Sequence, residues 1–292
     1  MRKTRLSSLN GVLLAVALCI TASGTAIAQD LKQTITNWES RLGARIGVTL
    51  RATPSDSIFT YKADQRFPMA STFKALMCGA VLARVDAGSV SLSDRVTYRA
   101  DQLQSYSPIT KDHVESGMSV ADLCEAAITL SDNTAANLML EKVDGPSRLT
   151  AFLRSIGNEM TRLDRWEPDL NEGTEGDPRD TTTPDAMALS LSQLLFGDTL
   201  QPASADRLKQ WMINDKVAST LIRPHLPEGW IIGDKTGTGG NGARGIVAFL
   251  QKPDGKSYVT AIYVTATDAA IALRNEAISD IGRAVVEEIR TH

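Results

Sequence analysis

The sequence predicts an α/β protein of the α+β type, with an antiparallel sheet built from both ends of the chain and an all-α block between them. Strand patterns occur in residues 44–64 and return in residues 229–266. The segment between them carries helical patterns from about residue 67 to residue 215. A helical block inserted into one antiparallel sheet is the simplest assembly of this order.

This order divides the chain into two expected domains. We expect a discontinuous α/β domain formed by residues 29–66 and 213–292. Residues 67–212 form the expected all-α domain. The cleft between two such lobes is a common place for a small-molecule site.

Composition narrows the class of protein. The chain has 292 residues, of which 42% are apolar and 22% charged, and its formal net charge is −3. These values are ordinary for a globular protein. The small negative charge provides no electrostatic footprint for nucleic acid, so we expect no nucleic-acid partner.

Residues 1–28 read as a secretory signal rather than as part of the fold. Basic residues precede the apolar run "GVLLAVALCI", and the small-residue sequence "AIA" ends at Ala28. A membrane anchor is the alternative, but the run is short for a bilayer. A lipoprotein signal at Cys19 is disfavoured because Leu18 precedes it. We expect export to the periplasm, cleavage after about Ala28 and no membrane segment afterwards.

Two cysteines, Cys78 and Cys124, remain after cleavage. In an exported chain such a pair predicts one disulfide. Closing a loop of that length stabilises by about 4 kcal/mol in the chain-entropy model. The alternative is two buried free thiols.

The N-terminal elements come first. A helix is predicted by apolar residues at helical spacing and a glycine stop, namely Leu31, Ile35, Trp38, Leu42 and Gly43. Residues 44–50 and 58–64 then read as two strands that flank the turn-rich segment "RATPSDS".

Helical patterns with clear start signals follow. A stripe begins at Phe73, and Ser119 can cap the next helix. Ser147 follows a Gly-Pro break and reads as a further cap, and Ser204 as the start of a later helix. Thr183 precedes a proline at the first helical position, which is a typical start.

Strand patterns return near the C-terminus, in residues 229–237, 243–250 and 257–266. The sequence "PDG" turns the last two strands into a hairpin. A closing helix begins near Ile271. The acidic, glycine- and proline-containing segment 162–184 fits neither lobe, and loops of this length are usually functional or disordered.

The stretch "STFK" contains the first candidate for chemistry. Ser71 and Lys74 are three residues apart, so they share one face of a helix. This arrangement suits a serine nucleophile whose proton is taken by the lysine, beside backbone N–H groups that can stabilise an oxyanion. The alternative is a capping serine with a surface lysine, and the motif alone does not decide.

Two further motifs are also ambiguous alone. "SDN", residues 131–133, presents a hydroxyl and an amide at a helix end, where a polar triplet is often only a turn. "DKTGTGG" follows an apolar strand, and its glycines permit close approach by a ligand. A phosphate-binding loop is excluded, because Asp234 stands where that motif needs glycine.

Together and in this order, "STFK", "SDN" and "KTG" resemble the signature of class A serine β-lactamases. "RWEPDLN" resembles the omega loop of that family, including its E-x-x-x-N pattern. The resemblance extends over the mature chain and includes "GARG" and the cysteine pair. It implies the β-lactamase/transpeptidase-like fold, with an omega loop at residues 162–180. The penicillinase and carbenicillinase branches are nearest, although carbenicillinases often have arginine in place of Lys235.

The resemblance implies catalytic roles for Ser71, Lys74, Ser131, Glu167, Asn171 and Lys235. Ser71 would attack the lactam carbonyl, and Glu167 with Asn171 would activate the water that hydrolyses the acyl-enzyme. Ser131 would pass a proton to the lactam nitrogen. Whether Lys74 or Glu167 is the base for acylation is disputed in the family, and the sequence leaves both open.

It also implies substrate-binding roles for Tyr106, Asn133, Thr236, Gly237, Thr238 and Arg244. Thr236 and Arg244, with Lys235, would bind the substrate carboxylate. The backbone N–H groups of Ser71 and Thr238 would form the oxyanion hole.

Structural roles are implied as well. Asp132 would tie loops together, and Arg165 would pair with Asp180 to close the omega loop. The peptide bond between Glu167 and Pro168 is expected to be cis.

The implied function is hydrolysis of penicillins, and of early cephalosporins, by a monomer without cofactor or metal, which confers β-lactam resistance. The histidines, His113, His225 and His292, stand apart and form no metal motif. The alternatives are a D,D-carboxypeptidase or transpeptidase and a β-lactam sensor domain, which normally lack the deacylating glutamate.

Overall fold

The structure, a computed structural model, describes residues 22–54 and 56–292. The predicted signal segment therefore lies outside the described residues, except for residues 22–28. No helix in the described part of the chain combines the length and apolar character that crossing a membrane requires.

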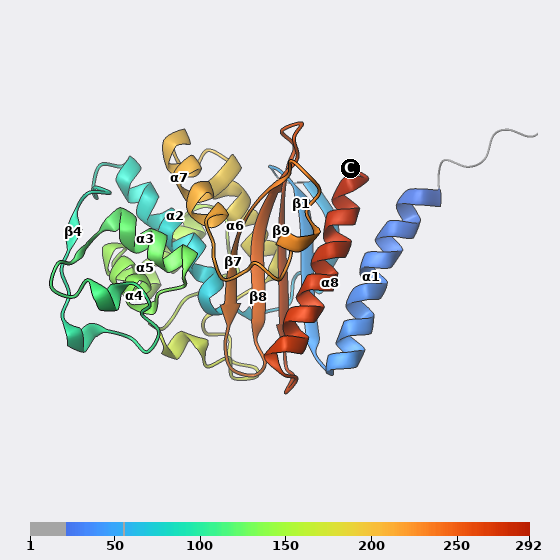
Figure 1. Ribbon diagram of the computed structural model, residues 1–292, viewed down its shortest axis with the longest axis horizontal. Helices are drawn as coiled ribbons and strands as arrows, with labels where there is room; N and C mark the ends of the chain where they lie inside the picture. Colours follow the sequence, from blue (N-terminus) through green and yellow to red (C-terminus); the bar gives the residue numbers. More distant parts are fainter. Residues whose placement is uncertain (1–21, 55) are drawn as a thin grey trace, which may run out of the picture.

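A five-stranded antiparallel sheet forms the centre of the molecule, with strand order β2-β1-β9-β8-β7 (Figure 1). Its strands are β1 (Arg45–Ala52), β2 (Asp56–Tyr61), β7 (Ile231–Thr238), β8 (Arg244–Gln251) and β9 (Ser257–Thr265). Strand β9 pairs with β1 on one side and β8 on the other, with Val48 opposite Ile262. The prediction of one sheet from both ends of the chain is confirmed.

One face of the sheet is covered by the two terminal helices, α1 (Ala22–Leu42) and α8 (Ile271–Arg290), which lie side by side (Figure 1). Their apolar stripes and the sheet form one buried cluster that includes Leu31, Ile35, Ile46, Ile262, Ile278 and Ile281. Gly43 has a positive φ of 56°, so it ends α1 in the conformation that a helix-stop glycine provides.

The other face carries the helical block. Its helices are α2 (Phe73–Asp86), α3 (Val120–Thr129), α4 (Asn133–Lys142), α5 (Pro146–Ser155), α6 (Pro184–Phe196) and α7 (Pro202–Ile213). Helix α6 packs on β1 and β9, and α7 packs on β7. One core cluster joins these helices to Val247, Phe249 and Tyr263 of the sheet. The expected boundaries near residues 67 and 212 stay predictions.

The structure also contains short elements that the sequence did not predict. Two-residue strands pair β3 (Phe67–Pro68) with β6 (Thr181–Thr182) and β4 (Arg95–Val96) with β5 (Met118–Ser119). Short 3-10 turns are η1 (Ala70–Thr72), η2 (Ala100–Gln102), η3 (Thr110–Asp112), η4 (Asp169–Asn171) and η5 (Arg223–His225). Elements of two or three residues are too short to leave a periodic pattern.

Two of the predicted helix caps and starts, at Ser119 and Thr183, are confirmed, and two, at Ser147 and Ser204, are wrong. Ser119 and Thr183 accept hydrogen bonds from backbone N–H groups in the first turns of α3 and α6. Ser147 and Ser204 lie inside α5 and α7 instead, because each of those helices begins earlier with a proline at its first position. Proline is suited to that position, where its missing N–H costs no intrahelical bond.

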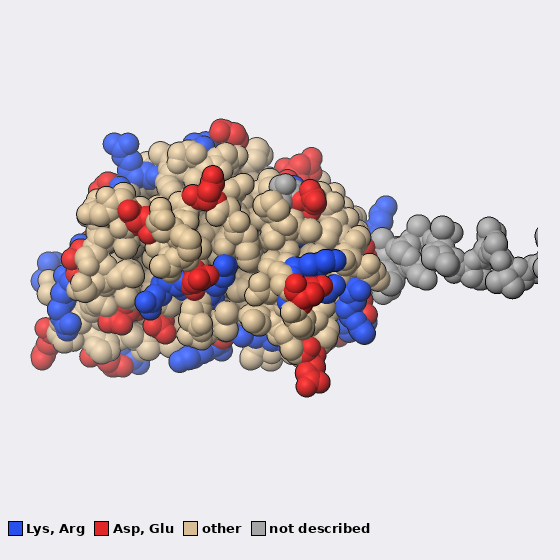
Figure 2. Space-filling view, turned by 90° about the horizontal axis from the view of Figure 1, so that it is seen from above, with Lys and Arg blue, Asp and Glu red and all other residues tan. Residues whose placement is uncertain are grey.

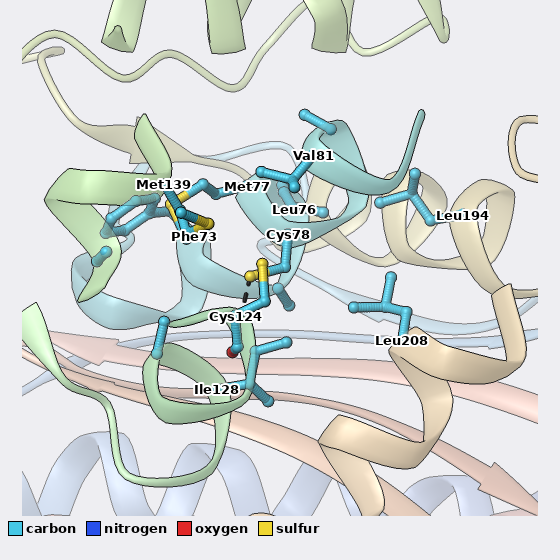
Figure 3. Close-up of a cluster of buried hydrophobic side chains, with 14 of the residues drawn as sticks. Phe73, Leu76, Met77, Cys78, Val81, Cys124, Ile128, Met139, Leu194 and Leu208 are labelled. Atoms are coloured by element: carbon cyan, nitrogen blue, oxygen red, sulfur yellow. Dashed lines mark hydrogen bonds between the residues drawn. The ribbon is translucent and has the colours of Figure 1, made fainter. Parts of the chain in front are cut away.

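The predicted disulfide is also wrong. Cys78 and Cys124 are free and fully buried (Figure 3), and the Cys78 thiol donates to the backbone carbonyl of Cys124 at 3.8 Å. Apolar side chains such as Leu76 and Ile128 surround them. Burial raises the pKa of the Cys78 thiol, which disfavours the thiolate that oxidation requires.

Surface charge agrees with the composition. On the face seen in Figure 2, basic and acidic side chains are interspersed rather than gathered by sign. This arrangement gives no broad field of one sign on that face.

Candidate active site

Ser71 lies in the turn η1, directly before α2, where strand β7 passes close to the backbone. No side chain caps the start of α2, so the capping interpretation of Ser71 is wrong. A Cβ on Gly237 would lie 2.7 Å from the carbonyl oxygen of Met69 and 3.1 Å from the amide nitrogen of Ser71. Glycine in β7 therefore permits the approach that makes this wall of the site.

Lys74 is fully buried, so the surface-lysine interpretation is wrong as well. Its Nζ donates to the Ser131 carbonyl at 2.8 Å and to Oδ1 of Asn133 at 2.7 Å, and lies 3.0 Å from Oε1 of Glu167. Burial lowers the pKa of Lys74, and the Glu167 carboxylate opposes that shift. The amine is thus held among acceptors, next to the loop carboxylate.

Glu167, from the segment predicted as an omega loop, faces the same space. Its Oε1 lies 3.5 Å from Oγ of Ser71, and its Oε2 accepts a hydrogen bond from the Asn171 amide. The peptide bond to Pro168 is cis, as expected. Nucleophile, lysine and carboxylate therefore meet although they come from segments about 100 residues apart.

Asn137 is a functional residue that the sequence analysis missed. Its side chain donates to the Glu167 carbonyl and accepts from the Glu167 N–H, both at 2.9 Å. Asn137 lies four residues after Asn133 on α4, so both point to one face of the helix. That spacing was the only signal for it.

The segment predicted as an omega loop, residues 162–180, is closed at its ends by ionic contacts. Arg165 donates from Nε to the Asp180 carboxylate at 2.6 Å and also pairs with Glu172. The Asp180 carbonyl accepts from the N–H of Met69, two residues before Ser71. The pairing that the resemblance implied is present, and it joins the loop to the nucleophile turn.

Ser131 projects between α3 and α4 with a positive φ of 60°. Its Oγ lies 3.4 Å from Nζ of Lys74 and 3.1 Å from Nζ of Lys235. The neighbouring Asp132 is fully buried and accepts bonds from backbone N–H groups of Ile109, Thr110 and Ala135. It ties the loop before α4 in place, as expected.

Two cations occupy the strand side of the site. Lys235 on β7 is fully buried, and burial lowers its pKa to about 7. Arg244 on β8 sits opposite Thr238 and donates to the Gly237 carbonyl at 3.1 Å and to Oγ1 of Thr238 at 3.3 Å. Burial lowers the pKa of Arg244 to about 10, which leaves it charged at neutral pH.

Asn275, at the start of α8, also escaped the sequence analysis. Its Oδ1 accepts from Nε of Arg244 at 2.8 Å and fixes the guanidinium. No motif marks an asparagine 31 residues from its partner.

A pocket of about 420 Å³ opens above these groups. It is lined by Ser71, Tyr106, Ser131, Asn133, Asn171, Val217, Thr236, Gly237, Thr238 and Arg244. The structure thus brings the predicted substrate-binding residues together, with Lys74, Glu167 and Lys235 within contact distance of Ser71 or Ser131. Val217 is an addition to the predicted set. A larger cavity, of about 590 Å³, is lined by none of the predicted residues.

Comparison with known proteins decides the family. A family model described as the β-lactamase enzyme family matches residues 29–289. The chain belongs to this family.

Solved structures similar to this β-lactamase agree. A tryptophan-to-aspartate mutant of the class A β-lactamase of the last common ancestor of Gram-negative bacteria shares 51% identity, with 90% of this chain and 99% of the other covered and a TM-score of 0.87. The ancestral class A β-lactamase shares 52% identity, with 88% and 99% covered and a TM-score of 0.85.

The chain is a class A serine β-lactamase, and its activity is β-lactam hydrolysis. These matches do not favour the alternatives of a carboxypeptidase, transpeptidase or sensor domain. The antiparallel sheet with its helical block is the fold of this class.

Proposed function

We propose that this β-lactamase hydrolyses penicillins, and early cephalosporins in part, through an acyl-enzyme on Ser71 that Glu167 makes transient. One observation carries the proposal. The Glu167 carboxylate lies 3.5 Å from the Ser71 hydroxyl and 3.0 Å from the Lys74 amine, so nucleophile and both candidate bases share one site.

Acylation begins when Oγ of Ser71 attacks the lactam carbonyl carbon and its proton passes to Lys74 or Glu167. Because these two groups contact each other, a proton taken by either can move to the other. The C–N bond of the lactam then breaks, and the nitrogen receives a proton from Ser131. Nζ of Lys74 lies 3.4 Å from Oγ of Ser131 and can replace that proton.

The developing oxyanion would be bound by the backbone N–H groups of Ser71 and Thr238. The close contact of η1 with β7 supports this pairing. Donors of this kind contribute about 3–4 kcal/mol to lowering the barrier in a serine hydrolase.

Deacylation needs a base beside a water molecule. Glu167 is held at its backbone by Asn137 and at its side chain by Asn171. Within the described part of the chain, Oδ1 of Asn171 is buried without a hydrogen-bond partner. This acceptor and the Glu167 carboxylate can orient a water toward the ester carbon, which Glu167 deprotonates as it attacks.

The substrate carboxylate would lie between Thr236 and Arg244, with Lys235 adding positive charge near Ser131. The Asn133 amide would bind the acyl side-chain amide. Tyr106, which is 49% exposed, would form the wall at the pocket entrance. Anionic β-lactams suit this cationic end of the pocket.

The substrate spectrum is proposed from two neighbouring residues. Gly239 lacks the serine that widens several relatives toward bulky cephalosporins, whereas the Thr238 hydroxyl can support some cephalosporin binding. Steady-state kinetics on ampicillin, carbenicillin, cefotaxime and imipenem test this. Cefotaxime hydrolysed as efficiently as ampicillin would contradict the proposed spectrum.

Mass spectrometry tests the acyl-enzyme. Glu167→Ala should accumulate a penicilloyl adduct on Ser71, because acylation can still use Lys74 while deacylation loses its base. The matched control is Glu159→Ala, which removes an exposed carboxylate just before the omega loop. A long-lived adduct on the wild-type protein would instead favour a transpeptidase, a carboxypeptidase or a sensor.

We also propose export to the periplasm, with cleavage after about Ala28, and action as a monomer that confers β-lactam resistance. The basic and apolar composition of residues 1–28 supports the export proposal. N-terminal sequencing of the periplasmic protein tests the cleavage site.

A further inference from the structure

A group of buried charges lies behind Lys235 and has no part in the steps above. It consists of two buried carboxylates, Asp215 after α7 and Asp234, which precedes Lys235 on β7, and of the partly exposed Arg223 at the start of η5. We call these three residues the rear charge cluster. Burying carboxylates is costly unless each has a compensating partner.

Arg223 compensates Asp234. Its Nε donates to Oδ2 of Asp234 at 2.8 Å, and its Nη2 lies 3.3 Å from Oδ1. The same guanidinium donates to the carbonyls of Met212 and Ile213 in the last turn of α7. Arg223 therefore ties the end of α7 to the strand that carries Lys235. Its charge lowers the pKa of both Asp234 and Asp215, and its hydrogen bonds go to Asp234.

Asp215 is held differently. Its Oδ1 accepts the N–H groups of Val217 and Ala218, both at 2.8 Å, and so shapes the turn that places Val217 in the pocket wall. Among the described residues, its Oδ2 is buried and has no hydrogen-bond partner. One oxygen of this carboxylate is thus satisfied by the backbone, and the other has no hydrogen bond among the described residues.

Four charged groups act on Lys235. Lys74 and Arg244 disfavour its ammonium form, whereas Asp215 and Asp234 favour it, and Asp215 has the largest effect of the four. Burial lowers the pKa of Lys235 to about 7 even with Asp215 present. A loss of the Asp215 charge would therefore leave Lys235 mostly neutral at neutral pH.

We propose that Asp215 is a positioning residue for β-lactam hydrolysis, which keeps Lys235 as an ammonium beside Ser131 and holds Val217 in the pocket wall. The inference rests on the proposed role of Lys235 in binding the substrate carboxylate. Asp215 does not line the pocket. It acts through Val217, which lines the pocket, and through Lys235, which lies beside Ser131.

The test is the pH dependence of kcat/KM for ampicillin in Asp215→Asn. Asparagine keeps an oxygen for the Val217 and Ala218 N–H groups and removes only the charge. Activity that needs the Lys235 ammonium is lost as the pH rises through its pKa, and removing a nearby negative charge lowers that pKa. The alkaline limb should move to lower pH by about one unit.

The difference in kcat/KM between wild type and Asp215→Asn should disappear at low pH. Burial raises the pKa of Asp215, so in acid the wild-type carboxyl takes up a proton and loses the charge that the variant lacks. Below that point Lys235 is charged in both proteins. The two profiles should therefore converge in acid and separate as the pH rises.

Three further variants separate charge from structure. Asp215→Ala removes the acceptor as well, so it should raise KM beyond the effect of asparagine. In a Lys235→Arg background, Asp215→Asn should leave the alkaline limb in place, because a guanidinium stays charged. Asp254→Asn, in the exposed turn between β8 and β9, is the matched control and should follow wild type.

An alkaline limb that Asp215→Asn leaves unmoved overturns the inference, as does an equal shift in the Lys235→Arg background. If Asp215→Asn does not fold, NMR titration of lysine-labelled wild-type protein, assigned with Lys235→Arg, still decides. The Lys235 resonance must then show a second inflection where Asp215 titrates. Failure of the proposed function is seen separately, as the absence of a penicilloyl adduct on Ser71.

Discussion

The two faces of the sheet are built in contrasting ways. Toward α1 and α8, the buried cluster consists of apolar side chains such as Ile46, Ile262 and Ile281. Toward the helical block, an apolar core ends at a cleft that buries Lys74, Glu167 and Lys235. Only the cleft places its buried charges beside a pocket.

The difference shows what makes buried charge tolerable. Each ionised group of the cleft has a partner of opposite charge or a set of hydrogen bonds, as Lys74 has with Glu167 and Asn133. Such a network favours reactivity over stability, because desolvation opposes much of its electrostatic gain. The apolar face gains from burial alone and supplies the stability that the cleft lacks.

The largest expected effect lies at the nucleophile. Ser71→Ala should lower kcat/KM for ampicillin by about 10⁴-fold or more, since losing a nucleophile removes the covalent route. The thermal midpoint should change little, because η1 and its contacts remain. Spectrophotometric hydrolysis and a thermal melt measure both, with the exposed Ser93→Ala as control. A thermal midpoint of Ser71→Ala that fell as far as that of a core variant would contradict the expectation that the cleft contributes little to stability.

On the apolar face, Ile281→Ala should destabilise the fold by about 2–5 kcal/mol, because it leaves a cavity in a fully buried site. Its kcat should stay near wild type under conditions where the protein is folded. Urea denaturation followed by circular dichroism measures the change. Ile271→Ala, at the exposed start of the same helix, should cost far less. A strong loss of kcat would show that α8 couples to the cleft.

A loop-anchoring residue should give an intermediate effect. Asn137→Ala removes two hydrogen bonds to the Glu167 backbone and should slow deacylation by about 30-fold, since each net bond contributes about 1 kcal/mol. Burst kinetics with ampicillin should show more acyl-enzyme at steady state. Asn37→Ala on exposed α1 is the matched asparagine control. Unchanged deacylation would mean that Asn171 and the loop ends fix Glu167 without Asn137.

The smallest effect is expected at the pocket entrance. Tyr106→Ala should raise KM by a few fold at nearly constant kcat, because the half-exposed ring adds only contact area worth about 1 kcal/mol. Tyr106→Phe keeps the ring and should resemble wild type. A large fall in kcat for the alanine variant would place the ring nearer the reacting atoms than its exposure indicates.

Local patterns predicted most of the fold. Alternating strands and helical stripes need only neighbouring residues, so the sheet, the stop at Gly43 and the caps at Ser119 and Thr183 were accessible. Ser147 and Ser204 misled because a preceding proline starts each of those helices earlier. The disulfide prediction was wrong because the number of cysteines does not reveal the direction of a buried thiol. The Cys78 thiol points to the backbone carbonyl of Cys124.

The residues of the site also fall into those that the sequence predicted and those that only the structure revealed. Its motif residues were found from the order of three short sequences and one loop, which is a property of the chain itself. Asn137, Asn275 and Asp215 were not, because each acts through a partner fixed by packing. A hydrogen bond from Arg244 to Asn275 has no counterpart in the spacing of either residue.

The sequence alone determined the element order, the family resemblance and the identity of the nucleophile and loop glutamate. Only the tertiary structure decided that Ser71 caps nothing, that Lys74 is buried and that Asp215 holds the turn before Val217. The reason is physical. Backbone preference and periodicity act between neighbours, whereas burial, and with it the charge state of a lysine, depends on every segment that packs around it.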